Sequence, residues 1–182
     1  MELRNVEADL VDDRERLTAL YESETGRRYS VFYVGERGLR LSDHYDPFFL
    51  VGATQAYLLG ETYRHPVPVN STLARNVRCL QKQWSQWYRR PAVEIEVETL
   101  EAELSCVSSP QKSGAFFSGG IDSLFTDIEL GKNLDYLISF EHRSNPREQI
   151  EDGFLQLDDL TSYVESTGRK HLKVVTNMMT EM

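Results

Sequence analysis

The chain has 182 residues, a formal net charge of −9 and a hydrophobic content of 40%. This composition supports a packed core for one domain, or a domain with a small appendage, and it argues against wholesale disorder. The acidic balance disfavours nucleic acid as a partner, because the average surface would repel a phosphate backbone.

Sequence signals for a membrane or for secretion are missing. The longest apolar stretch, residues 47–60, is shorter than the about 20 residues that span a bilayer. The N-terminus lacks the basic and hydrophobic regions of a signal peptide, so we expect a cytoplasmic protein. The two cysteines, Cys79 and Cys106, lack the paired spacing of a zinc site, and we expect buried free thiols.

Residues 1–108 are expected to form a small α+β domain. The segments 16–23 and 28–35 each alternate in side-chain character around Thr25-Gly26, which predicts a β-hairpin. Residues 92–100 alternate in the same way and predict a further strand.

Two helices are predicted inside this segment. Asp46 reads as the N-cap of the first helix, with Pro47 at its first position and Gly60 as its stop. The prolines of residues 65–70 predict a rigid connector between the helices. Asn70 or Ser71 then caps the second helix. Its apolar positions share one face, which is expected to pack in the core of this domain: Leu73, Val77, Leu80, Trp84 and Trp87.

Residues 105–114 are rich in turn formers and mark the predicted domain boundary. Beyond it, segments 114–118, 136–140 and 171–176 are short apolar strands. The helices between them are 121–131 and a longer one that Pro146 opens and Gly168 ends. The helix face is expected at Ile150, Phe154, Leu157, Thr161 and Val164. This alternation predicts an α/β fold whose parallel strands lie in the order 3-2-1, with helices covering both sheet faces.

The string Ser118-Gly119-Gly120 follows the first of these strands and precedes a helix. Ligands of parallel sheets bind beyond the carboxyl ends of the strands, which is where this string falls. The glycines allow backbone N–H groups to approach an anion, and the helix N-terminus adds partial positive charge. Ser118 and Ser123 supply hydroxyl groups. Together they predict a concave nest for phosphate.

Asp122 adds a carboxylate to this loop. Beside a bound phosphate it would be repulsive unless a hard cation bridged the two, which points to Mg²⁺. The simpler alternative is a tight turn followed by a charge that interacts with the helix dipole.

The segment "FSGGIDS" at 117–123 resembles the PP-loop of the N-type ATP pyrophosphatases, which include asparagine synthetase and the 7-cyano-7-deazaguanine synthases. The resemblance implies the first half of an adenine nucleotide alpha hydrolase-like (HUP-type) domain at 114–182. Residues 46–61 and 67–98 also look like the N-terminal region of bacterial PP-loop proteins akin to the deazaguanine synthases.

This resemblance implies ATP as cofactor and an AMP- and pyrophosphate-forming reaction of amide- or nitrile-forming type. A carboxylate, amide or carbonyl oxygen of an unidentified small-molecule substrate would attack the α-phosphorus. The residues implied in ATP binding are Phe117, Ser118, Gly119, Gly120, Ile121, Asp122 and Ser123. Asp122 would also be the catalytic residue that organises the metal.

Further candidates follow the second and third strands. Phe140, Glu141 and His142, with Arg143 after them, could face nucleotide or substrate, or could equally be loop residues. Thr176-Asn177 is in a similar position. Sulfur transfer is disfavoured, because neither cysteine is expected at this rim.

PP-loop domains usually continue with strands on the other side of the first strand, whereas this sequence ends just past the third. We therefore expect a fragment or a split enzyme completed by a second polypeptide, in preference to a second copy that pairs the open edge. A module that keeps the fold but has no turnover is the alternative to a ligase.

Overall fold

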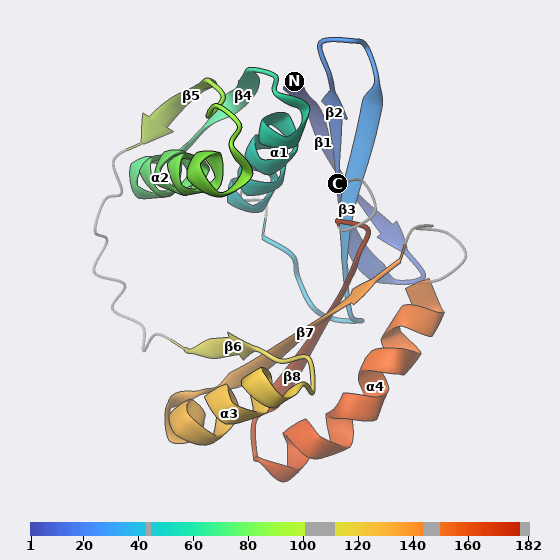
Figure 1. The fold of residues 1–182 in the computed structure, drawn as a ribbon. Helices are drawn as coiled ribbons and strands as arrows, with labels where there is room; N and C mark the ends of the chain where they lie inside the picture. The colour runs from blue at the N-terminus through green and yellow to red at the C-terminus, as the bar shows by residue number, and fades with distance from the viewer. Residues whose placement is uncertain (43–44, 101–111, 144–149, 179–182) are drawn as a thin grey trace.

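The computed structural model describes residues 1–42, 45–100, 112–143 and 150–178 (Figure 1). Strands and helices alternate along most of the chain, so the α/β class is confirmed. In chain order the elements are β1 (Glu2–Val11), β2 (Arg14–Glu22), β3 (Arg28–Gly35), α1 (Asp46–Leu59), β4 (Tyr63–Asn70), α2 (Ser71–Tyr88), β5 (Ile95–Leu100), β6 (Gly114–Phe116), α3 (Ile121–Leu130), a 3₁₀ turn (Gly131–Asn133), β7 (Tyr136–His142), α4 (Ile150–Ser166) and β8 (Lys170–Thr176).

The described strands form one mixed sheet in the order β5-β4-β1-β2-β3-β8-β7-β6. The last three strands are parallel and confirm the predicted 3-2-1 order, which places β6 at the edge of the described sheet. Antiparallel pairing of β3 with β8 joins the N-terminal and C-terminal segments, and Tyr33 pairs there with Thr176. The boundary expected within residues 105–114 lies largely outside the described residues.

The predicted hairpin is confirmed by β2 and β3, which pair from Glu22 with Arg28 to Arg16 with Val34. Strand β1 was not predicted, although it pairs with β2 along nearly its whole length. The reason lies in its exposure, because Leu3 is its only fully buried residue and most of the others face solvent. Without a buried face, a strand shows no alternation of apolar and polar residues.

Residues 65–70 were wrongly interpreted as a connector, because they belong to strand β4. Proline cannot donate to a ladder of hydrogen bonds, so Pro66 and Pro68 argue against a strand with a neighbour on each side. The ladder avoids them: the pairing of β4 with β5 shifts register between His65 and Val69, and β4 meets β1 at Arg64.

The predicted capping of the two N-terminal helices is partly correct. Asn70 caps α2 and accepts the N–H of Thr72 at 2.8 Å, and Gly60 ends α1 in the left-handed conformation, with φ of 74°. The N-cap of α1 is Tyr45 instead of Asp46, which lies in the first turn and binds no helix N–H group.

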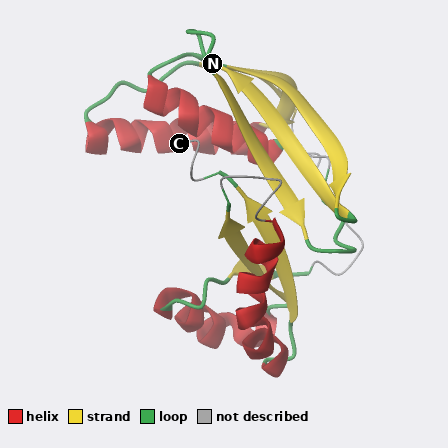
Figure 2. Ribbon diagram, turned by 90° about the vertical axis from the view of Figure 1, so that its right-hand side faces the viewer, coloured by secondary structure: helices red, strands yellow, loops and turns green. Residues whose placement is uncertain are grey.

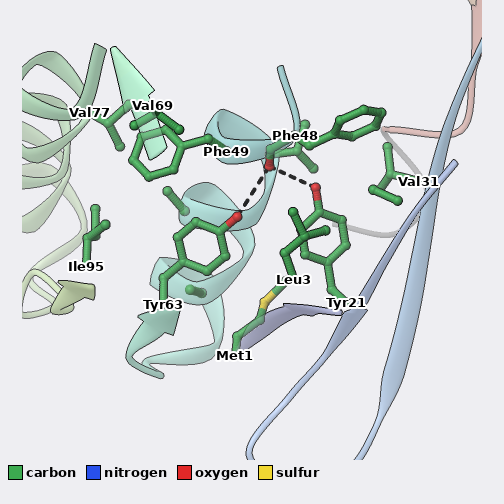
Figure 3. Close-up of a cluster of buried hydrophobic side chains, with 14 of the residues drawn as sticks. Met1, Leu3, Tyr21, Val31, Phe48, Phe49, Tyr63, Val69, Val77 and Ile95 are labelled. Carbon is green, nitrogen blue, oxygen red and sulfur yellow. Dashed lines mark hydrogen bonds between the residues drawn. The ribbon is translucent and has the colours of Figure 1, made fainter. Parts of the chain in front are cut away.

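The largest core cluster lies between α1, α2 and the first five strands (Figure 3). Two buried tyrosine hydroxyls, of Tyr21 and Tyr63, point at the carbonyl oxygen of Phe48 in α1, at 2.8 and 3.5 Å. Buried phenols need such partners, and these two tie α1 to strands on either side of β1. The predicted face of α2 is confirmed near its start, where Val77 is buried.

Two expectations for α2 are wrong. Trp87 was expected in the core, yet it is 69% exposed in the last turn of α2. Cys79 was expected to be buried and is exposed. Its position follows from the helix period, because it lies two residues after the buried Val77 and therefore on the opposite side of α2. Cys106 lies outside the described residues.

The two C-terminal helices lie on one face of the sheet, whereas the sequence predicted helices on both faces (Figures 1 and 2). Phe117 and Leu137 pack with Leu124 of α3 and Val164 of α4 in a single cluster. Strand β3 shows that α1 covers the opposite face: Val31 packs toward α1, and its neighbour Phe32 packs toward α4. No described helix is long and apolar enough to cross a membrane.

Candidate functional site

The segment 117–123 forms a short connection between the end of β6 and the start of α3. Phe117 is buried, and Ser118, Gly119 and Gly120 are exposed. Gly119 has φ of 73°, a left-handed conformation that favours glycine, and Gly120 is the N-cap of α3 with an extended backbone. The predicted strand–turn–helix is therefore present, with the strand ending two residues earlier than expected.

The two serines hydrogen-bond inside the loop. The Ser123 hydroxyl donates to the carbonyl oxygen of Gly120 at 2.8 Å and accepts the N–H of Ser118 at 3.3 Å. The Ser118 hydroxyl accepts the N–H of Gly120 at 3.4 Å. The two hydroxyl oxygens are also 3.4 Å apart, and because the one Ser123 proton is already donated, Ser118 is the donor in that contact. At this length the bond is weak, so the Ser118 hydroxyl can turn to a ligand at small cost.

Three backbone N–H groups remain open at the start of α3. Gly120 makes no side-chain cap, and the N–H groups of Ile121, Asp122 and Ser123 have no acceptor in the described part of the chain. The first N–H groups of a helix lack intrahelical acceptors, and here they emerge beside exposed glycines. An anion at this point would receive several N–H donors together with the positive end of the α3 dipole.

Residues below the loop hold its first carbonyl group in place. The Ser139 hydroxyl of β7 donates to the carbonyl oxygen of Phe117 at 2.6 Å, and the Phe117 ring stacks on Tyr163 of α4 at 5.2 Å between ring centres. On the β8 side, His171 Nε2 lies 2.9 Å from the Ser139 oxygen. These contacts join three elements to the residue from which the loop departs.

The donor and acceptor in each of these hydrogen bonds follow from the last acceptor in the series, the carbonyl oxygen of Phe117. Phe117 offers a carbonyl oxygen, so Ser139 donates to it and accepts from His171 Nε2–H. His171 Nδ1 then accepts from the Thr161 hydroxyl, 3.0 Å away. Burial lowers the pKa of His171, and the nearby Lys173 lowers it further, which favours the neutral ring that this pattern requires. We call Thr161, His171 and Ser139 the support chain.

The sequence reasoning missed the support chain. Ser139 is a buried polar residue inside an otherwise apolar strand, and buried polar groups are almost always hydrogen-bonded. That signal predicts a partner for Ser139 but does not say which residue supplies it. His171 comes from a strand 32 residues later, so only the parallel pairing of β7 with β8 brings the two together.

Glu141 and His142 were expected in the connection after the second strand, but β7 extends to His142. Phe116 pairs with Ile138, so Phe140 lies level with Ser118, and its ring is 5.5 Å from that of Phe116. Glu141 and His142 lie about 3 and 7 Å further along the strand. The carboxyl ends of the parallel strands therefore lie side by side as expected, and Phe140 is the candidate residue nearest to the loop.

Arg143 brings a positive charge to the same rim. Its guanidinium donates to the Glu141 carboxylate at 2.6 Å and to the carbonyl oxygen of His142 at 3.0 Å, and both charged side chains are partly buried. Glu141 is therefore already paired within the protein. An anion near this end of β7 would compete with Glu141 for Arg143.

Thr176 and Asn177 lie at the end of β8, as predicted, but their side chains bind the protein. The Asn177 amide accepts the N–H of Phe32 at 2.9 Å and donates to the carbonyl oxygen of Ser30 at 2.8 Å. The Thr176 hydroxyl accepts the N–H of Met178. Both residues are buried. The Asn177 side chain fastens the end of β8 to β3 and extends the strand pairing beyond its last residue.

Asp122 is exposed in the first turn of α3. Within the described ranges, no group of three His, Cys, Asp or Glu residues could hold a metal ion. Asp122 alone therefore offers one carboxylate. Mg²⁺ is commonly bound by one or two carboxylates together with phosphate oxygens and water. The loop fits Mg²⁺ when a phosphate ligand supplies the remaining oxygens.

The loop lies on an open edge of the described structure and not in a closed cavity. A pocket of about 530 Å³ lies elsewhere, between the end of α1 and residues 90–94. Beyond β6 the described sheet has no further strand, so it shows no reversal of strand order at this point. Comparisons with known protein families, with curated proteins and with solved structures found no match for this chain.

Proposed function

We propose that the 118–123 loop binds the polyphosphate of ATP together with Mg²⁺. The observation that carries this proposal is the set of open N–H groups at Ile121, Asp122 and Ser123, exposed at the carboxyl end of a parallel strand. Gly119 and Gly120 allow close approach, and Ser118 adds a hydroxyl donor. Asp122 carries the carboxylate that would bind the cation on the phosphates.

The PP-loop resemblance extends this proposal to a reaction and a fold. A substrate oxygen would attack the α-phosphorus of ATP, and the bond from that phosphorus to the bridging oxygen would break. Pyrophosphate then leaves, carrying the negative charge that develops. The N–H groups of the loop, and a cation on Asp122, would stabilise that charge in the transition state. The protein would be an adenylating ligase or synthetase that forms an amide or a nitrile.

The position of β6 supports a second candidate, a nucleotide-binding or assembly module without turnover. The loop is walled by α3, α4 and β7 on one side, and its other side is open in the described structure. Among the described residues, none on that side could bind a second substrate. Catalysis would then require a second polypeptide or a second copy at the β6 edge.

Calorimetric titration with ATP tests the binding site. Ser118→Ala should weaken binding by about tenfold with or without Mg²⁺, because it removes a donor to a charged group. Asp122→Ala should weaken binding by a similar factor only when Mg²⁺ is present. Without the cation, removal of a charge that repels phosphate should leave affinity unchanged or improve it. Glu129→Ala, at the far end of α3, is the matched control.

Two results would contradict the binding proposal: no ATP binding by the wild-type protein, or equal losses for Asp122→Ala and Glu129→Ala. Turnover is a separate question. Release of pyrophosphate from ATP in the presence of candidate carboxylates and amides, lost in Asp122→Ala, favours the ligase. ATP binding without pyrophosphate release, also in the presence of any partner chain that co-purifies, favours the module.

A further inference from the structure

Helix α3 presents an apolar stripe to solvent. Ile121, Phe125 and Ile128 follow at spacings of four and three residues, so they share one flank, and they are 82%, 63% and 74% exposed. Leu124 faces the sheet, and Asp127 faces α4, where it accepts from the Tyr163 hydroxyl at 2.9 Å. Around the helix axis, Leu124 lies between Asp127 and the stripe. The stripe therefore points away from α4 and past the β6 edge.

Within the part of the chain that the structure describes, strand β6 has no partner on that edge. Phe117 donates its N–H to the carbonyl oxygen of Ile138 at 2.8 Å, so Ala115, two residues earlier, also directs its backbone groups toward β7. Gly114 and Phe116 alternate with them and direct N–H and C=O groups outward. Phe116 is 71% exposed on the sheet face opposite α3. Unpaired edges with apolar flanks are the sites at which sheets pair with other chains.

We propose that two copies of this chain pair through β6 in antiparallel fashion, and that each copy brings Lys112 to the phosphate loop of the other. This pairing makes Gly114 of one copy and Phe116 of the other a hydrogen-bonded pair, and the two-fold axis repeats it. Both residues of each pair direct their backbone groups outward, so the register satisfies four N–H and four C=O groups at once.

The side chains of this register are also complementary. Each Phe116 ring lies opposite a glycine, an arrangement in which the aromatic ring covers the bare backbone of the neighbouring strand. A two-fold axis normal to the sheet puts both α3 helices on the same face. Because α3 packs over β6, the two helices lie close enough for their stripes to meet.

The available apolar area suits a dimer. Phe116, Ile121, Phe125 and Ile128 together expose on the order of 500 Å² per copy, against about 800 Å² per partner in a typical stable interface. The paired strand backbones add to that area. These residues form two groups, the α3 stripe on one sheet face and Phe116 on the other, and together they make an apolar surface at the upper end of what monomers expose. A second copy covers it without any other chain.

The same register brings Lys112 of one copy close to the phosphate loop of the other. Two residues beyond the Gly114–Phe116 pair, Lys112 of one copy lies level with Ser118 of the other. Lys112 is exposed, with its ammonium 3.1 Å from the Tyr136 hydroxyl. Its side chain lies beside Tyr136 on the sheet face opposite α3. To reach the loop, its four-carbon stem must leave Tyr136 and pass around the β6 edge, where Asp122 or a bound phosphate attracts it. This part of the inference rests on the proposed function; the strand pairing does not.

Light scattering after size exclusion tests the interface. The wild-type protein should have twice the 21.0 kDa mass of the chain. Phe125→Glu should give monomers, because it buries a charge in the stripe. Leu10→Glu is the control, since Leu10 is 71% exposed on β1, far from β6 in the sheet order. A monomeric wild type, or a dimer that Phe125→Glu leaves intact, overturns the proposal.

Cross-linking tests the register without risk of unfolding. In a background with Cys79→Ser and Cys106→Ser, Ala115→Cys should form a disulfide with itself across the axis. The two residues form a non-hydrogen-bonded pair with Cα atoms about 4.5 Å apart, within the range that a disulfide spans. Glu98→Cys, on the opposite sheet edge, should stay reduced. Failure of Ala115→Cys to cross-link in a dimer refutes this register.

ATP titration then separates the two proposals. Lys112→Ala should weaken binding about tenfold while the dimer persists. Mixing Lys112→Ala with Asp122→Ala should restore about one site in four, because mixed dimers hold one intact loop facing an intact lysine. No restoration means that Lys112 does not act across the interface, which overturns that half of the inference. A dimer that binds no ATP keeps the interface and refutes the proposed function alone.

Discussion

Adjacent glycines in the loop should respond to alanine in different ways. At Gly119, φ of 73° costs a non-glycine residue about 1–2 kcal/mol, and the added Cβ would lie 2.9 Å from Leu160 Cδ2. The restricted unfolded chain returns about 0.4–1 kcal/mol. Because the leucine methyl group can shift at small cost, we expect Gly119→Ala to destabilise the fold by about 1 kcal/mol.

At Gly120 the same substitution should be nearly neutral. Its φ of −76° is open to alanine, and the nearest atom to an added Cβ is Ser118 Oγ at 3.4 Å. The gain from the unfolded chain is offset by the poorer N-cap, which leaves a change within about 0.5 kcal/mol. Urea unfolding followed by tryptophan fluorescence measures both variants. Equal destabilisation of the two would refute the loop geometry described here.

Three further predictions concern buried groups. Burial lowers the pKa of His65 to about 4, so the unfolded chain takes up that proton first. Stability should therefore fall by about 1.5 kcal/mol as the pH drops from about 6.5 to 5. In His65→Gln, urea unfolding at both pH values should show a smaller fall, and an equal fall would contradict the assignment. A glycine-to-alanine change inside a helix is normally stabilising. Gly52→Ala should instead destabilise the protein, because the added Cβ would lie 2.2 Å from the Tyr63 hydroxyl oxygen. A higher melting temperature would count against this packing. Ser139→Ala should lower the free energy of unfolding by about 1–3 kcal/mol in urea, because it leaves His171 Nε2–H without its acceptor. If the support chain positions the loop, ATP affinity should fall as well. Thr126→Ala is the control, since the Thr126 hydroxyl binds only its own helix, and it should change stability and affinity less.

The parts of the fold that sequence predicted best are set by local chemistry. The Thr25-Gly26 turn, the Asn70 cap and the glycine that ends α1 each act within a few residues, and all three are where the sequence placed them. The order of β6, β7 and β8 needed one further rule, the right-handedness of the connections between parallel strands. The short loop after β6 was predicted on the same local grounds.

Features that depend on distant residues could not be read from the sequence. Nothing near β1 marks it as a strand, because its partners lie on β2 and β4 and most of its side chains face solvent. The prolines of β4 are tolerated through a shift in the pairing with β5, which no local pattern reveals. The placement of both C-terminal helices on one face was also missed, although it follows from the predicted strand order, because two right-handed connections that step in the same direction put their helices on the same face.

The two sides of the loop differ in how firmly they are held. On the inner side, Ser139, His171 and Tyr163 fix Phe117, and Asn177 fastens β8 to β3, so the backbone leading into the loop is anchored to the rest of the sheet. On the outer side, β6 has three residues, an edge without a partner among the described strands, and an apolar helix beside it. A site that must bind a highly charged ligand benefits from fixed N–H groups, because donors already in place need no reorganisation when charge arrives. An unpaired edge next to such donors leaves them open to water, which weakens their effect. If the loop binds an anion as proposed, its inner half needs little reorganisation, and covering the β6 edge should strengthen the hold on that anion.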